Sequence, residues 1–177
     1  QGLHILKVWS KDPNGNISTT SNDLLVYYDT VNPTLAPTTP GIQKGGNSIN
    51  LSWDATDEST SSSQSFQVDF YNGSAWSSVG TTTAANGPLS SQSFSRAWTV
   101  PSLDITNARF RVSFTDLAGN SSTVQSSAFE IDSTAPSLSY SSPADGSYHL
   151  SSTVITGNCE NGLPINISGD LQADFAT

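Results

Sequence analysis

The chain has 177 residues, with six Lys and Arg against fifteen Asp and Glu, and a net charge of −9 at pH 7. This balance excludes the basic surface that nucleic acids and anionic membranes attract, so no nucleic-acid partner is expected. One cysteine excludes a disulfide framework, and no apolar stretch approaches the roughly 18 residues of a membrane span. Because Ser and Thr supply 51 residues, we expect a hydroxyl-rich surface.

Short strands are predicted through the middle of the chain, where apolar and polar side chains alternate. This period of two places successive side chains on opposite faces of a strand. The predicted strands cover residues 47–54, 64–71, 75–80, 94–100 and 107–115, with a last one near 129–131. The predicted core-facing side chains are Ile49, Leu51, Trp53, Phe66, Val68, Phe70, Phe110, Val112 and Phe114. No segment has a helical period, so the sequence predicts an all-β fold.

The predicted turns are marked by Asn, Asp and Gly. Asn72-Gly73 predicts a tight primed turn with positive φ angles, which closes a hairpin. The Asp-x-x-Gly-Asn segments at 12–16 and 116–120 predict hairpin tips, because Asp accepts hydrogen bonds from nearby backbone NH groups and Gly tolerates the left-handed conformation. Cation or ligand binding by Asp116 and Asn120 is an alternative, but the turn chemistry accounts for both residues.

An internal repeat predicts the length of the modules. The sequence VWSKDPNGN at 8–16 aligns with VSFTDLAGN at 112–120, and DTVNP at 29–33 aligns with DSTAP at 132–136. The pairs occur in the same order at offsets of 104 and 103 residues, which is the length of one small domain. We therefore predict the closing part of one module at 1–33, a complete module at 34–135 and the opening part of a further module at 136–177.

Short strands separated by Gly, Pro, Asn and Ser clusters are typical of an antiparallel two-sheet sandwich. The segments FQVDFYNGSAW, WTVP, ARFRVSFTDLAGNSS and DSTAP resemble the immunoglobulin-like and fibronectin type III-like modules repeated in bacterial secreted and surface proteins. The segment PSLSYSSPADGSY resembles the opening strands of another such module. The resemblance implies tandem immunoglobulin-like β-sandwich modules, without the inter-sheet disulfide of antibody domains because the chain has one cysteine.

The two partial modules raise the question of what completes them. A hairpin of 33 residues does not bury both of its faces by itself. The interpretation favoured here is a segment of a longer chain, and the alternative is a homo-oligomer in which the incomplete end modules exchange strands or form a trimeric fibre.

No catalytic, cofactor or metal site is assigned from the sequence. His4 and His149 are the two histidines, and neither lies in a recognisable Ser-His-Asp setting. No phosphate-binding loop, dinucleotide fingerprint or HExxH motif is present. We therefore predict that the protein is not an enzyme.

Calcium binding at the module junctions is the metal hypothesis. In tandem modules Asp29 would lie near the loop with Asp57 and Glu58 and near the tip at Asp116, and calcium prefers such oxygen ligands. A second junction would bring Asp132 near Glu160 and Asn161. The reading favoured from the sequence is that Asp29 and Asp132 cap strands before proline and that the loop acids are solvated.

The tryptophans and the cysteine have simple interpretations. Trp53 and Trp98 are predicted core residues, whereas Trp76 follows a turn and is a candidate exposed ring that could stack on a sugar. Cys159 is predicted in a turn without a basic neighbour, as an unreactive thiol.

The predicted function is that of a non-catalytic structural or adhesive module of a bacterial extracellular or cell-surface protein, of the fibre or adhesin type. The alternative is an accessory carbohydrate-binding or spacer module of a secreted hydrolase. The expected partners are neighbouring modules of the same protein and a host-surface protein or glycan.

Overall fold

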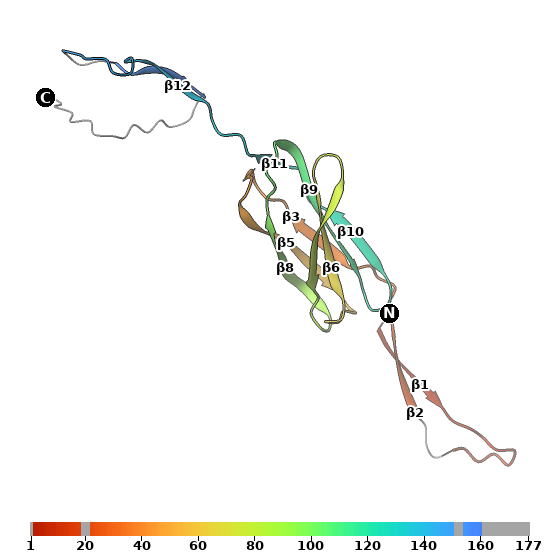
Figure 1. The fold of residues 1–177 in the computed structure, drawn as a ribbon. Helices are drawn as coiled ribbons and strands as arrows, with labels where there is room; N and C mark the ends of the chain where they lie inside the picture. Colours follow the sequence, from red (N-terminus) through yellow and green to blue (C-terminus); the bar gives the residue numbers. More distant parts are fainter. Residues whose placement is uncertain (1, 19–21, 151–153, 161–177) are drawn as a thin grey trace. The chain divides into compact units, whose positions relative to one another are not determined.

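Every regular element in the structure is a β-strand, which confirms the all-β prediction (Figure 1). The computed structural model describes residues 2–18, 22–150 and 154–160. In these ranges there is no helix with the length and apolar character to cross a membrane. The chain divides into two compact units, Gln1–Ser133 and Thr134–Thr177. The module boundary at 33/34 stays a prediction.

Two sheets build the core of the larger unit. The first has three antiparallel strands in the order β3 (Thr34–Thr38), β5 (Ser48–Asp57) and β8 (Leu89–Thr99). The second runs in the order β4 (Gln43–Lys44), β11 (Phe129–Asp132), β9 (Ile105–Thr115), β6 (Ser65–Tyr71) and β7 (Trp76–Thr83), and β10 (Ser121–Gln125) also pairs with β9. Among the described strands of this unit, only β4 and β11 pair in parallel. The two sheets come close together at two places, where β10 lies beside β3 and where β7 lies beside β8.

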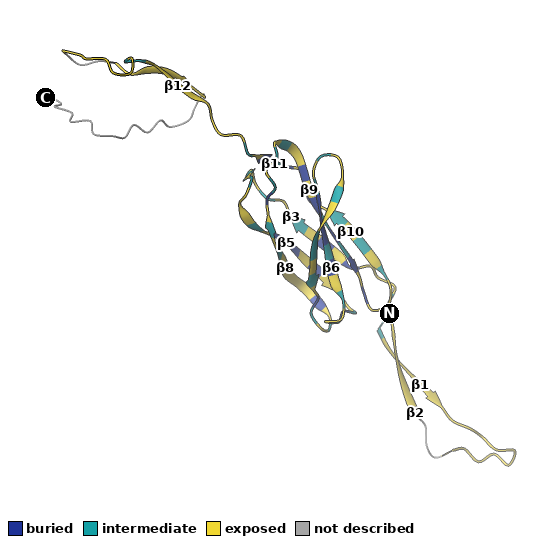
Figure 2. Cartoon of the chain, viewed as in Figure 1, coloured by how far each residue is buried: buried dark blue, intermediate teal, exposed yellow. Residues whose placement is uncertain are grey.

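One hydrophobic core joins the two sheets, as the buried residues in Figure 2 show. Trp53 of β5 is fully buried, and its ring centroid lies 5.5 Å from that of Phe66 on β6. Phe66 also stacks on Phe114 of β9 with a centroid distance of 4.3 Å. The predicted core is confirmed at every position except Ile49, which is partly buried. Trp98 likewise packs against the core while partly exposed.

The six predicted strands are confirmed, with bounds that differ by a few residues. The strands β3, β4 and β10 were not predicted. The reason is local: β3 contains Pro37, β4 has two residues, and β10 reads SSTVQ, with Val124 as its one apolar side chain. These strands are defined by pairing with β5, β11 and β9, which periodicity does not reveal.

The predicted primed turn at Asn72-Gly73 is wrong in type, although the hairpin is present. Tyr71 pairs with Trp76, so four residues connect β6 and β7. Gly73 has φ of +93°, whereas Asn72 does not have a positive φ. Instead, Asn72 Oδ1 accepts hydrogen bonds from the backbone NH groups of Ser74 and Ala75, at 3.0 and 2.9 Å. The Asn side chain thus closes a longer turn than the dipeptide predicts.

The two Asp-x-x-Gly-Asn segments form the same turn, as predicted. In each, the Asp NH donates to the Asn carbonyl, at 2.9 Å in residues 12–16 and 3.0 Å in residues 116–120. The Asn NH donates back to the Asp carboxylate at 2.8 Å in both turns. The side-chain amides of Asn16 and Asn120 donate to the second carboxylate oxygen, at 2.7 and 2.9 Å. Gly15 and Gly119 have φ angles of +95° and +97°, which glycine adopts without strain.

Two further strand pairs lie outside the two-sheet core. The hairpin of β1 (Gly2–Val8) and β2 (Asn22–Tyr28) is antiparallel and carries the first of these turns at its tip. In the second unit, β12 (Leu138–Ser142) pairs with β13 (Thr156–Cys159). Cys159 is therefore the last residue of a strand and not part of a turn, because its backbone pairs with Leu138. Its thiol is exposed and free.

Candidate cation site at Asp29, Asp57 and Asp116

Three aspartates from distant parts of the chain converge where the β1–β2 hairpin is followed by β3. Asp29 comes directly after β2, Asp57 ends β5, and Asp116 follows β9. One carboxylate oxygen from each lies within 4.8 Å of the others. Asp57 is 6% exposed and Asp116 4% exposed, so two of the three carboxylates are shielded from water.

The turn at 116–120 fixes one side of this cluster. Asp116 is held by the backbone NH and the side-chain amide of Asn120, as described above. The same amide donates to the backbone carbonyl of Asp29 at 3.3 Å. Asn120 therefore connects the turn to the residue that follows the hairpin, through the amide nitrogen of its side chain.

Ser59 positions the other two carboxylates. Its backbone NH donates to Asp57 Oδ2 at 3.0 Å, and its hydroxyl donates to Asp29 Oδ2 at 2.7 Å. Asp29 Oδ1 also accepts the backbone NH of Val31 at 2.9 Å, which confirms the strand-end cap predicted for Asp29. The hydrogen bond from Val31 that caps the strand does not prevent Asp29 from also binding a cation, because each carboxylate oxygen has more than one lone pair.

Burial and the neighbouring carboxylates change the pKa of Asp57. Burial raises its pKa above the ordinary value of 3.8, and the negative charges of Asp116 and Asp29 raise it further. The ion pairs of Lys7 with Asp23 and of Arg111 with Asp69 include neither Asp57 nor Asp116. Either a bound proton or a bound cation relieves such repulsion.

Hard oxygen ligands converging from three segments suit a divalent cation, and calcium accepts six to eight oxygens in flexible geometry. Carboxylates can supply several of these, and backbone carbonyls and water the others. No family model matches the chain, and no curated protein matches it. The interpretation of this site therefore depends on its chemistry alone.

The remaining predicted site residues are placed as follows. Glu58 is exposed and is not among the three converging acids. Asp132 ends β11 and Glu160 follows β13 in the other unit, whereas Asn161 lies outside the described residues, so the second junction stays a prediction. His4 is exposed on β1, and exposed His149 shares a hydrogen bond of 2.8 Å with Ser147.

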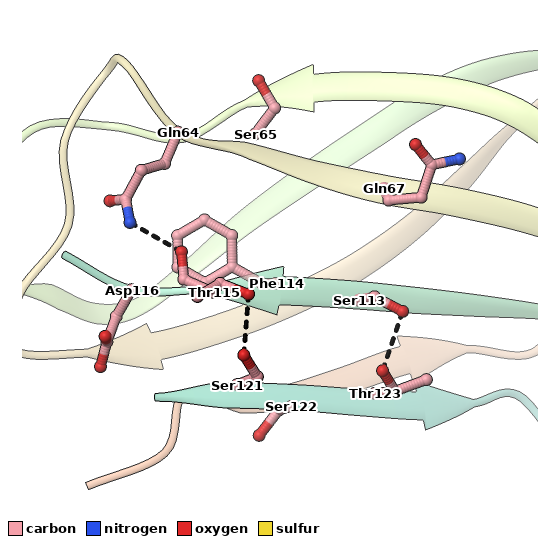
Figure 3. A pocket seen from close by; sticks show the side chains of 10 residues that line it. All are labelled: Gln64, Ser65, Gln67, Ser113, Phe114, Thr115, Asp116, Ser121, Ser122 and Thr123. Atoms are coloured by element: carbon pink, nitrogen blue, oxygen red, sulfur yellow. Dashed lines mark hydrogen bonds between the residues drawn. The ribbon is translucent and has the colours of Figure 1, made fainter. Parts of the chain in front are cut away.

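A shallow groove of about 620 Å³ adjoins Asp116 on β6, β9 and β10 (Figure 3). Its hydroxyls bond to one another, Thr115 to Ser121 at 2.8 Å and Thr123 to Ser113 at 2.9 Å. The aromatic residue that lines it, Phe114, is 2% exposed. The groove thus presents a polar, internally bonded wall without an exposed ring for a sugar to stack on.

Trp76 is half-buried in a contact with its neighbours. The Arg111 guanidinium carbon lies 4.4 Å from the Trp76 ring centroid, and the Tyr71 ring packs at 5.2 Å. Arg111 also donates to Asp69 at 2.9 Å. This arrangement covers part of the tryptophan that the sequence made a candidate for glycan stacking.

A pH titration tests the electrostatics of Asp57. Because its pKa is raised in the folded protein, the folded state binds this proton more tightly than the unfolded state. With chelator present, the contribution of Asp57 to stability should decline as pH rises above 3.8 and through the raised folded value. Asp57→Asn should remove this decline, because an amide does not titrate in this pH range, and its oxygen can still accept the hydrogen bond of the Ser59 NH. Denaturant unfolding at several pH values measures it, and a constant difference between wild type and variant would contradict the assignment.

Proposed function

We propose that this chain is a non-catalytic structural or adhesive segment of a bacterial extracellular or cell-surface protein, built from tandem immunoglobulin-like modules. The observation that carries the proposal is the repeated turn at 12–16 and 116–120, with the same set of hydrogen bonds at equivalent places in two hairpins. A repeated unit of this kind favours a modular protein over a single-site enzyme.

The finer fold assignment belongs to this proposal. Strands β3, β5 and β8 form one sheet, β4, β6, β7, β9, β10 and β11 form the other, and residues of both contribute to one hydrophobic cluster. Antiparallel layers that share a core are typical of an immunoglobulin-like sandwich. We infer that residues 34–135 are one complete module.

A divalent cation has a mechanical role in this proposal. Calcium at Asp29, Asp57 and Asp116 would tie the residue after β2 to the ends of β5 and β9. It would replace the mutual repulsion of three carboxylates by attraction to a common charge. The junction would then resist bending, which suits a protein that presents a binding surface at a distance.

Limited proteolysis tests both the module and the junction. We expect cleavage near 134–137, at the boundary of the two compact units, because segments between packed units are accessible. With chelator we also expect cleavage within 29–33, where Val31 is 49% exposed, leaving a resistant core of about residues 34–133. Calcium should protect 29–33 and leave cleavage near 134–137 unchanged. Mass spectrometry of the fragments identifies the cut sites, and persistent cuts within β5, β6 or β9 would contradict the proposal.

The contacts of Trp76 do not favour the carbohydrate-binding alternative. We expect Trp76→Ala to lower the free energy of unfolding by roughly 1–2 kcal/mol through loss of the cation–π and ring contacts. We expect no change in retention on insoluble cellulose or chitin. Wild-type retention that the variant loses, with the fold intact by circular dichroism, would instead support the accessory-module function.

A further inference from the structure

Two arginines of β9 point outward from the larger of the two sheets. Arg109 and Arg111 are two residues apart, and Phe110 between them is fully buried, so both arginines lie on the face that turns away from the core. Arg109 is exposed and takes part in no hydrogen bond or ion pair within the described residues. Its positive charge is therefore available to a partner from outside the chain.

Contacts within the sheet hold Arg111 in place and leave part of its guanidinium unused. Arg111 Nε donates to Asp69 Oδ2 at 2.9 Å, and Gln67 Nε2 donates to Asp69 Oδ1 at 2.8 Å. The two Nη atoms of Arg111 donate to no acceptor in the part of the chain that the structure describes, and its side chain is 33% exposed. Because a guanidinium carries five N–H donors in a fixed fork, these Nη atoms can bind a second carboxylate without a movement of the side chain.

Two half-buried aromatic rings lie beside the arginines. The Trp76 ring centroid lies 4.4 Å from the Arg111 guanidinium carbon and 5.2 Å from the Tyr71 ring centroid. Tyr71 is also the cross-strand neighbour of Arg109, and its hydroxyl donates to the Gly73 carbonyl at 2.9 Å. We call Tyr71, Trp76, Arg109 and Arg111 the Arg-aromatic patch. Tyr, Trp and Arg are the residue types that contribute most to binding at protein interfaces.

We propose that the Arg-aromatic patch is a docking surface for an acidic segment of a partner protein, which binds in an extended conformation with one carboxylate on each arginine. The charges are complementary, because the Arg109 guanidinium and the Nη atoms of Arg111 are open to an anion. The spacing is complementary too. Residues two apart in a strand are separated by about 6.6–6.8 Å, and side chains two apart in an extended peptide have the same separation. An acidic segment therefore reaches both arginines when its acids occupy alternate positions.

The contacts of the patch favour a protein segment over an acidic glycan. Arg111 and Tyr71 pack against the Trp76 ring, so this ring is engaged by side chains of its own sheet. A peptide carboxylate needs only the guanidinium groups, and these are open. The inference goes beyond the proposed function, since it depends on neither the module repeat nor the cation site.

The net charge of the chain makes the expected binding weak and local. The charge of −9 opposes an acidic partner at long range, so affinity has to come from contact with both arginines. At about 0.1 M salt, charges more than about 10 Å away are largely screened, whereas pairs in contact are screened less. Binding is therefore best measured near this salt concentration.

Fluorescence polarisation with two labelled peptides of equal length and charge tests the proposal on the full chain. One peptide repeats Glu-Ser, and the other repeats Glu-Glu-Ser-Ser. In an extended conformation only the first places two glutamates on one face two residues apart. We expect the Glu-Ser peptide to bind roughly three- to tenfold more tightly, because only it pairs with both arginines at once.

Arg109→Gln removes one of the two charges without breaking a hydrogen bond within the described residues. It should weaken binding of the Glu-Ser peptide by roughly three- to tenfold and abolish the difference between the peptides. Lys11→Gln is the matched control, since it changes the net charge equally at an exposed residue between β1 and β2. The control should bind like wild type. In NMR spectra, the backbone amides that shift on addition of the peptide should lie in β6, β7 and β9.

Several results would overturn this assignment. They are no binding of the Glu-Ser peptide, equal affinity for the two peptides, equal effects of the two variants, or amide shifts confined to β3, β5 and β8. Tighter binding of oligogalacturonate that Arg109→Gln abolishes would replace the protein segment by an acidic glycan. Self-association of wild type that the same variant abolishes would replace it by a second copy of the chain.

Discussion

Millimolar calcium is expected to raise the melting temperature of this protein by roughly 6–20 °C over the value with chelator. The estimate assumes a dissociation constant of about 0.1–1 mM, as in extracellular calcium modules, and about 10 mM calcium, which gives about 1.4–2.7 kcal/mol. For a domain near 100 residues, each 1 kcal/mol shifts the melting temperature by about 4–8 °C. The physical reason is that the proposed site exists only where folding brings Asp29, Asp57 and Asp116 together.

Asp116→Asn should remove most of this calcium response, because it replaces a buried charged ligand with a neutral amide. The repeated turn provides the control. Asp12→Asn changes the same residue in a turn with the same hydrogen bonds, but Asp12 is not among the converging carboxylates. Calorimetry with calcium and with chelator measures both variants. An equal melting temperature of wild type in the two conditions, or an equal loss of response in both variants, would rule out the site.

Phe66→Ala is expected to lower the free energy of unfolding by about 3–5 kcal/mol, a large part of the stability of a small domain. Phe66 is fully buried, and its ring packs between the two sheets against Trp53, Phe94 and Phe114, with centroid distances of 5.5, 4.6 and 4.3 Å. Truncation would leave a cavity at the centre of the core and remove three ring contacts.

Urea unfolding followed by tryptophan fluorescence measures the effect of Phe66→Ala, because Trp53 adjoins the site of substitution. Ile42→Ala serves as the control, since Ile42 is 73% exposed and its truncation should change stability by less than about 0.5 kcal/mol. A loss below about 1 kcal/mol for Phe66→Ala would mean that the two sheets do not share the tightly packed core described above.

The strands in which apolar and polar side chains alternate strictly could be predicted from the local sequence. In β9, Phe110, Val112 and Phe114 alternate with polar residues, and all three are buried. Strand β10 could not be predicted, because Ser and Thr fit either a strand or a loop until β9 provides a pairing partner. The turn at Asn72 was assigned the wrong type for a related reason: its side chain, and not only its backbone, closes the turn.

The candidate cation site was predictable in part. The sequence placed Asp29 at a strand end, and Asp57 and Asp116 in a loop and a hairpin tip that tandem modules would bring near it, and those three converge. It also included Glu58, which is exposed. Asp57 is the last residue of β5 and Glu58 lies in the bend after it, so which of the two faces the cluster depends on where β5 ends, and the register of β5 with β8 shifts near Asp57.

By itself, the sequence determined the all-β class, the main core positions and the shape of the two repeated turns. These depend on side-chain periodicity and on hydrogen bonds that span four residues. Only the tertiary structure decided which acids meet, which weakly patterned segments become strands, and that Trp76 lies against Arg111. Each of these involves residues many positions apart in the chain, and their proximity follows from strand pairing and sheet packing.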